Sequence, residues 1–140
     1  MDILTVEQRS NRMRRVRQRG TKPELAVRRA LHAMGFRFRL HRRDLPGRPD
    51  IVMPGRRVVI FVHGCFWHRH LGCSRTTTPK TRTDYWLPKF AENESRDARA
   101  IAKLWTAGWR VHVVWECEVL RPEALRRSLL EFLICSDTEP

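Results

Sequence analysis

The sequence lacks several features that define common classes of protein. It has no run of about 18 apolar residues, which excludes a conventional membrane-spanning helix. The first 20 residues contain no apolar segment before a small-residue cleavage site, so we expect no secretory signal and a cytoplasmic, nucleoid-associated location. Internal repeats and Gly/Ser-rich linkers are also missing. The 140 residues are therefore typical of one domain.

Acidic residues are scarce. Asp and Glu number 15 against 28 Lys and Arg, which gives a formal net charge of +13. A domain this basic indicates a polyanionic partner, most simply a nucleic acid. Six arginines fall within residues 1–20. We therefore expect a basic N-terminal arm over residues 1–20 that contacts DNA, followed by a single domain over residues 21–140.

The pattern of apolar residues predicts a mixed α/β fold, a central mixed β-sheet flanked by helices. A capping box begins at Thr21, and Gly35 marks the end of the first helix. The expected elements are a helix over 22–34, strands over 36–40, 50–53 and 57–62, a helix over 84–107, a strand over 109–115 and a helix over 122–134. Residues 63–83 have no periodicity, and a loop of that length is usually functional or held by a metal.

Cysteine and histidine residues concentrate in this irregular segment. The candidate ligands are Cys65, His70, Cys73 and Cys117. Three thiolates and one imidazole make the Cys3His set of a structural zinc site, whereas buried free thiols are the alternative. The spacing alone also allows His68 to replace His70. Cys135 remains outside this set of ligands, and we expect it to behave as a small apolar residue.

Three acidic residues are candidates for chemistry in combination with a histidine. Whichever of His68 and His70 does not bind the metal can act as a general base near neutral pH, and His63 is a third candidate. Asp50 starts a strand and can hold Mg²⁺, although it can equally cap a turn. Asp97 shares a helix face with apolar residues, where it pairs either with His68 or with neighbouring arginines. Glu24 closes the capping box of the first helix or reaches the metal site.

Aromatic pairs lie beside these polar groups. Phe66 and Trp67 belong to the irregular segment, and Trp86 follows Tyr85 at the start of the long helix. Aromatic rings on a basic surface can stack on bases or wedge between them, whereas packing in the core is the alternative.

The chain resembles the very short patch repair (Vsr) endonucleases at three motifs, Leu-Pro-Gly-Arg-Pro-Asp over 45–50, His-Gly-Cys-Phe-Trp-His over 63–68 and Lys-Thr-Arg-Thr over 80–83. The likeness extends over 93–97 and 115–117. It implies a fold like that of the restriction endonucleases, with one structural zinc. It also implies a Mg²⁺-dependent, strand-specific nick in duplex DNA, 5′ to the thymine of a T:G mismatch produced by deamination of 5-methylcytosine.

The resemblance also implies roles for individual residues. Asp50 matches the catalytic metal ligand, His68 the general base and Asp97 the acid that supports it, with Glu24 as an acid near the active site. The residues matching the zinc ligands are Cys65, His70, Cys73 and Cys117. The residues matching the aromatic and aliphatic wedge beside the mismatch are Phe66, Trp67, Trp86 and Met13.

The chain departs from the family pattern at Val62, where the pattern has threonine. The change costs little if the backbone carbonyl of residue 62 holds Mg²⁺, and activity suffers if the hydroxyl matters. We expect a monomer that acts on mismatched duplex DNA in DNA repair, and a mismatch-repair protein remains open as a partner. Two alternatives are a zinc-stabilised DNA-binding module without catalysis and a restriction-type endonuclease that cuts matched sites.

Overall fold

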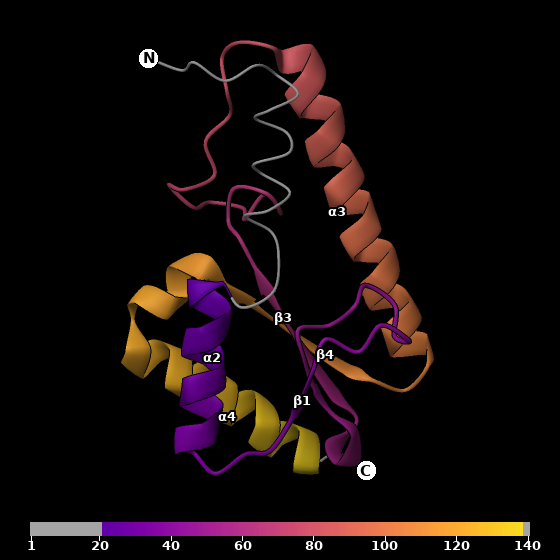
Figure 1. Cartoon of the computed structure of the whole chain (residues 1–140), viewed down its shortest axis with the longest axis vertical. Helices are drawn as coiled ribbons and strands as arrows, with labels where there is room; N and C mark the ends of the chain where they lie inside the picture. Colours follow the sequence, from indigo (N-terminus) through magenta and orange to yellow (C-terminus); the bar gives the residue numbers. More distant parts are fainter. Residues whose placement is uncertain (1–20, 139–140) are drawn as a thin grey trace.

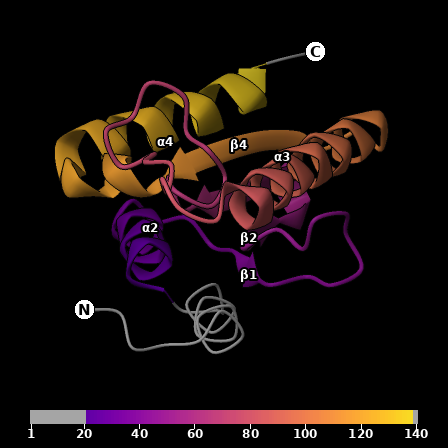
Figure 2. The same ribbon diagram turned by 90° about the horizontal axis from the view of Figure 1, so that it is seen from above.

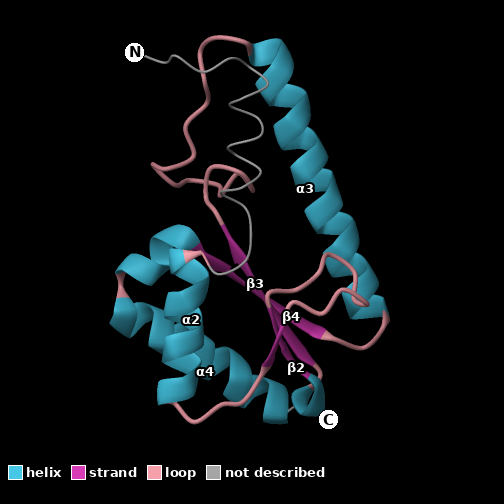
Figure 3. Cartoon of the chain, in the orientation of Figure 1, coloured by secondary structure: helices cyan, strands magenta, loops and turns pink. Residues whose placement is uncertain are grey.

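A computed structural model describes residues 21–138, with side chains for residues 21–134. The expected N-terminal arm over 1–20, with Met13, lies outside the described residues. Figure 3 shows the helices and strands of the chain and the loops that connect them. The elements are α2 (Lys22–Ala33), β1 (Arg39–Leu40), β2 (Ile51–Met53), η1 (Pro54–Arg56), β3 (Val58–His63), α3 (Thr83–Thr106), β4 (Arg110–Trp115), η2 (Glu116–Leu120) and α4 (Pro122–Thr138).

The four strands form one mixed sheet in the order β1-β2-β3-β4. The first three strands make an antiparallel meander, and β4 pairs with β3 in parallel after the crossover through α3. Because β3 and β4 are parallel, their carboxyl ends lie at the same edge of the sheet. This edge carries the polar residues that the sequence singles out.

Helices cover both faces of the sheet, which confirms the predicted fold class (Figures 1 and 2). On one face, α2 and α4 pack against the sheet through an apolar cluster that includes Leu31, Ile60 and Leu129, all fully buried. On the other face, α3 packs through Leu104 against Val59. Because both faces of β2 and β3 are covered by helices, these strands are continuous apolar runs and do not alternate apolar and polar residues.

The first predicted strand is shorter than expected. It was predicted over 36–40 and spans only Arg39–Leu40. The register pairs Arg39 with Val52, so residues before 38 would lie opposite Pro54 and the turn that follows it. Proline has no N–H to donate, and a ladder ends there. The helices and the other strands match their predicted ranges within about two residues, except that α4 runs to Thr138.

The connection between β3 and α3 contains neither helix nor strand over residues 64–82, as expected. In Figure 1 the amino-terminal half of α3 extends past the edge of the sheet and runs beside this connection. The loop also contacts the sheet, because His70 stacks on Trp115 at the end of β4 with ring centroids 4.2 Å apart. Within the described part of the chain, no helix has the length and apolarity that crossing a bilayer requires.

Candidate active site and metal site

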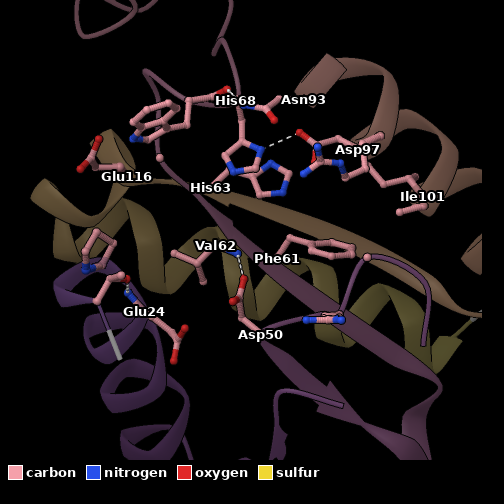
Figure 4. Close-up of a pocket in the computed structure, with 18 of the residues that line it drawn as sticks. Glu24, Asp50, Phe61, Val62, His63, His68, Asn93, Asp97, Ile101 and Glu116 are labelled. Atoms are coloured by element: carbon pink, nitrogen blue, oxygen red, sulfur yellow. Dashed lines mark hydrogen bonds and ion pairs between the residues drawn. The ribbon is translucent and has the colours of Figure 1, made fainter. Parts of the chain in front are cut away.

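A cleft lies where β3 ends, and it brings together side chains from four parts of the chain (Figure 4). Its walls are the start of α2, the segment before β2, the end of β3 with the loop that follows, and one face of α3. The predicted site residues that line it are Glu24, Asp50, Val62, Phe66, Trp67, His68 and Asp97. Residues up to 73 positions apart in the sequence thus share one cavity.

The backbone of β3 fixes the carboxylate of Asp50. The N–H of Val62 donates a hydrogen bond to Asp50 Oδ2 at 2.7 Å (Figure 4). The N–H and C=O of one strand residue point toward the same neighbouring strand. The Val62 carbonyl therefore points to the side of β3 on which Asp50 lies. The Val62 side chain packs against the apolar cluster under α2 and α4. Valine therefore suits this position, because the backbone rather than the side chain meets Asp50.

Burial raises the pKa of the Asp50 carboxyl to about 7. The Val62 hydrogen bond acts in the opposite direction, and the nearby charge of Glu24 adds to the increase. Two carboxyl groups in a largely buried place repel each other when both are ionised. A divalent cation relieves this repulsion, so the pair has the oxygen donors and the charge that suit Mg²⁺.

Glu24 points into the cleft from the first turn of α2. Its backbone N–H donates to Thr21 Oγ1 at 3.4 Å, so Thr21 caps the helix as predicted. The Glu24 carboxylate, only 3% exposed, forms an ion pair with Arg28 and lies 3.0 Å from His41 Nε2. The sequence interpretation missed Arg28 and His41. The four-residue spacing of Glu24 and Arg28 could have indicated that pair, whereas no local signal links residues 24 and 41.

A histidine–carboxylate pair faces Asp50 across the cleft. His68 Nδ1 lies 2.6 Å from Asp97 Oδ2, and His63 stacks on His68 with ring centroids 3.8 Å apart. Burial, followed by the proximity of His68, lowers the pKa of His63 to about 3, which keeps His63 neutral. The amide of Asn93 donates to the carbonyl of Trp67 at 3.3 Å and ties the loop to α3. The Asp97 side chain therefore faces the histidines rather than the surface arginines.

The four predicted zinc ligands converge at the same edge of the sheet, outside the cleft. One donor atom from each of Cys65, His70, Cys73 and Cys117 lies within 4.8 Å of all the others. His70 Nδ1 is 3.6 Å from Cys65 Sγ and 3.4 Å from Cys117 Sγ.

The chemistry of this donor set fits a zinc ion. Burial raises the pKa of the Cys65 thiol to about 12, so a nearby cation is needed to hold it as a thiolate. Three sulfurs and one imidazole nitrogen suit a tetrahedral Zn²⁺. The geometry groups His70 with the cysteines and His68 with Asp97, the choice that spacing alone leaves open.

An aromatic cluster adjoins the cleft. Phe66 meets Trp67, Trp86 and Phe90 edge to face, with ring centroids 5.2, 5.8 and 5.2 Å away. Phe66 and Trp67 are partly exposed, whereas Trp86 is only 3% exposed and lies behind them. The predicted wedge thus has two residues at the surface and one beneath it.

Comparisons with known proteins show which proteins the chain resembles. The family described as "DNA mismatch endonuclease Vsr" matches residues 1–75. A type II nicking enzyme, V.XorIIP of Xanthomonas oryzae pv. oryzae, is 54% identical over 132 residues, which cover 94% of this chain and 96% of that protein. The DNA mismatch endonuclease Vsr of Escherichia coli is 43% identical over 141 residues, covering 97% of this chain and 89% of the relative.

A solved structure supports the fold assignment. The catalytic domain of the homing endonuclease I-Bth0305I superimposes with a TM-score of 0.58 over 84% of this chain and 98% of that domain. The two sequences are 17% identical, so this likeness concerns the fold alone. It is the architecture expected of an endonuclease core, with a mixed sheet between helices.

Proposed function

Since this chain belongs to the Vsr family of DNA endonucleases, we propose that it nicks one strand of duplex DNA, 5′ to the thymine of a T:G mismatch. The reaction is Mg²⁺-dependent hydrolysis of a phosphodiester in very short patch repair. The observation that carries this proposal is the cleft that sets the half-buried carboxylate of Asp50 opposite the His68–Asp97 pair.

His68 accepts the proton of the attacking water. Its Nδ1 is engaged by Asp97 Oδ2 at 2.6 Å, which leaves Nε2 as the ring nitrogen free to take that proton. Asp97 orients the ring and stabilises the imidazolium that forms. His63, neutral and stacked on His68, limits the rotation of the ring without adding a charge.

The Asp50 carboxylate and the Val62 carbonyl are the groups that would hold the catalytic cation. When bound, Mg²⁺ supplies Lewis-acid polarisation of the scissile phosphate and stabilises the charge on the leaving 3′ oxygen. The Val62 N–H bond fixes the direction of the Asp50 carboxylate beforehand. Glu24 contributes negative charge at the same place and is held there by Arg28 and His41.

Selectivity for a mismatch follows from the cost of separating stacked bases. Phe66 and Trp67, at the surface beside the cleft, enter the DNA next to the target, and Trp86 supports them from behind. A T:G pair stacks less well than a matched pair, so opening the duplex there costs less. We assign Met13, on the basic arm over 1–20, to insertion between the same stacked bases from the opposite side of the duplex.

The remaining assignments concern the assembly. The Cys/His group would hold a structural Zn²⁺ that shapes the loop carrying Phe66, Trp67 and His68. The protein acts as a monomer on DNA, with residues 21–140 as the endonuclease domain, and a mismatch-repair protein is a candidate partner. The net charge of +13 supplies attraction to phosphates that is independent of sequence.

A strand-resolved cleavage assay tests the proposal. One duplex carries a T:G mismatch in a CC(A/T)GG-type context and the other carries the matched pair, each with a different label on each strand. With Mg²⁺ present, the wild type should nick only the thymine strand of the mismatched duplex, and it should nick neither duplex in EDTA. Asp50→Asn should reduce the rate by about 1,000-fold or more, because the amide no longer neutralises the cation.

The matched control is Asp44→Asn. Asp44 is also an acidic residue of the segment between β1 and β2, but its side chain is 61% exposed and pairs with Arg42. This variant should nick like the wild type. Binding without nicking would favour a DNA-binding module without catalysis, and equal cleavage of both duplexes would favour a matched-site endonuclease.

A further inference from the structure

A second group of metal-binding side chains adjoins Asp50. Glu24, His41 and Asp50 each offer one donor atom, and the three atoms lie within 4.8 Å of one another. The group combines two carboxylates with an imidazole. His41 has no role in the function proposed above beyond its contact with Glu24.

The backbone conformation of His41 fixes where its side chain lies. It follows β1 directly, and its N–H donates to the carbonyl of Asp50 at 3.2 Å, which continues the β1–β2 ladder by one bond. Its φ of 51° is in the left-handed region, which histidine tolerates better than most residues. The arrangement turns the imidazole back toward Glu24, from which Nε2 lies 3.0 Å away.

A positive group already lies among these donors. The Arg28 guanidinium pairs with Glu24 Oε2, and its Nη2 lies 3.1 Å from His41 Nε2. Among the described residues, Arg28 Nε is buried without a hydrogen-bond partner. Arg28 is thus only partly satisfied where it lies. Its side chain is 20% exposed, so it has a route to solvent when another cation takes its place.

We propose that Glu24, His41 and Asp50 together form a cation site in which the His41 imidazole is a direct ligand, so that the site prefers Mn²⁺ or a similar transition-metal ion to Mg²⁺. This deepens the proposed function, because it rests on Asp50 as a cation ligand. Mg²⁺ is held almost entirely by oxygen, whereas transition-metal ions bind imidazole nitrogen well. Replacing one oxygen donor by a nitrogen therefore shifts the preference toward Mn²⁺.

The test measures the coordination itself. The full chain is first loaded with one equivalent of Zn²⁺ per chain to fill the Cys/His group and freed of excess Zn²⁺, then titrated with Mn²⁺ and followed by electron paramagnetic resonance. Pulsed spectra of the wild type should show coupling to a directly bound ¹⁴N nucleus. His41→Gln should remove this coupling and weaken Mn²⁺ binding about tenfold, a typical effect of losing a metal-site partner. Mg²⁺ affinity, measured by competition with Mn²⁺, should change less than about threefold, since glutamine still offers an oxygen.

Two further variants sharpen the result. Arg28→Gln should tighten Mn²⁺ binding, because it removes the competing guanidinium from the site. His32→Gln is the matched control: His32 lies in the last turn of α2 and stacks on Phe38 at 4.6 Å, away from these donors. It should leave both the spectrum and the affinity unchanged.

Other outcomes overturn the proposal. Absence of nitrogen coupling in the wild type, or coupling that persists in His41→Gln and disappears in His68→Gln, excludes His41 as the ligand. An equal loss of Mn²⁺ and Mg²⁺ affinity in His41→Gln would show that His41 positions Glu24 and is not itself a ligand. In each case, nicking of the thymine strand by the wild type that is lost in Asp50→Asn would still support the proposed function, whereas absence of nicking by the wild type would reject that function.

Discussion

The contact between His68 Nδ1 and Asp97 Oδ2 is short, 2.6 Å, and both side chains are partly buried. Asp97→Asn keeps the shape of the side chain but removes the charge that stabilises a protonated His68. We expect the single-turnover nicking rate to fall by about 100-fold, the usual contribution of an assisted general base. DNA affinity, measured separately, should change little, because the His68–Asp97 pair stabilises the transition state of the chemical step and does not contribute to binding of the duplex.

Glu94→Gln is the control for Asp97→Asn. Glu94 lies one turn earlier on α3, is exposed, and loses the same single charge on substitution. Its nicking rate should equal that of the wild type. A comparable loss of rate in both variants would show that the general electrostatic field of α3 matters, rather than the pairing with His68.

At the residue scale, the sequence could predict the chemistry only where local pattern or family resemblance carried it. Asp50, His68 and Asp97 were selected in this way, and the structure places all three in one cleft. Their catalytic roles stay predictions. His41 could not be found, because its relevance depends on a contact 17 residues away across two elements and on a backbone conformation that no sequence pattern signals.

At the scale of elements, the loop over 64–82 depends on side chains rather than on backbone ladders. Arg69 is its main tie. The guanidinium donates to the carbonyls of Phe66 and Thr77 at 3.3 and 2.9 Å and to Thr78 Oγ1 at 2.7 Å. It also lies 4.0 Å from the centroid of the Phe90 ring on α3. One side chain thus joins both halves of the loop to the helix beside it.

Arg69→Ala should therefore loosen the loop and the metal group within it. We expect the rate of Zn²⁺ release to a colorimetric chelator to rise by about tenfold, the usual scale for residues that support a metal site. Arg75→Ala, which removes an exposed cation of the same loop, should release Zn²⁺ at the wild-type rate. Equal release rates in the wild type and Arg69→Ala would mean that the metal ligands alone order the loop.

The packing of β4 on α4 contains a titratable group. His112 stacks on Phe132 at 4.7 Å and lies 3.5 Å from Ser128 Oγ, and burial lowers its pKa. Arg110, the cation on the same strand, also lies near this contact, 5.8 Å from the centroid of the Phe132 ring. Protonation of His112 is therefore unfavourable in the folded protein and ordinary in the unfolded chain.

The sign of the pH effect follows from this difference. Stability from the neutral ring is fully present above the unfolded pKa of about 6.5 and is lost as the pH falls toward the lower folded pKa. Between pH 7 and 5, the wild type should lose more unfolding free energy than His112→Gln, as measured by urea denaturation. Parallel pH profiles for the two proteins would show that the ring does not titrate in this window.

Element boundaries were predictable where periodicity and caps agreed, as for α2 between Thr21 and Gly35. The shortened β1 was not, because its length is set by Pro54, which directly follows the neighbouring strand β2, rather than by its own alternating residues. Residues 63–83 were recognised as irregular from the lack of periodicity. What that pattern could not give is the role of Arg69, whose partners lie before it, after it and on α3.

At the scale of the whole molecule, the Cys/His group joins parts that are distant in the sequence. Cys117 lies in η2 beyond β4, while its three partners follow β3. Cys117→Ser should remove bound zinc and lower the melting temperature by about 10 °C, from a loss of about 3 kcal/mol. Treatment with a chelator should lower the wild-type value similarly and change the variant little, because the variant has no zinc to lose. Cys135→Ser, which alters the cysteine outside the ligand set, should behave as the wild type in calorimetry and zinc analysis. A Cys117→Ser protein that retains one zinc per chain would contradict the four-ligand site.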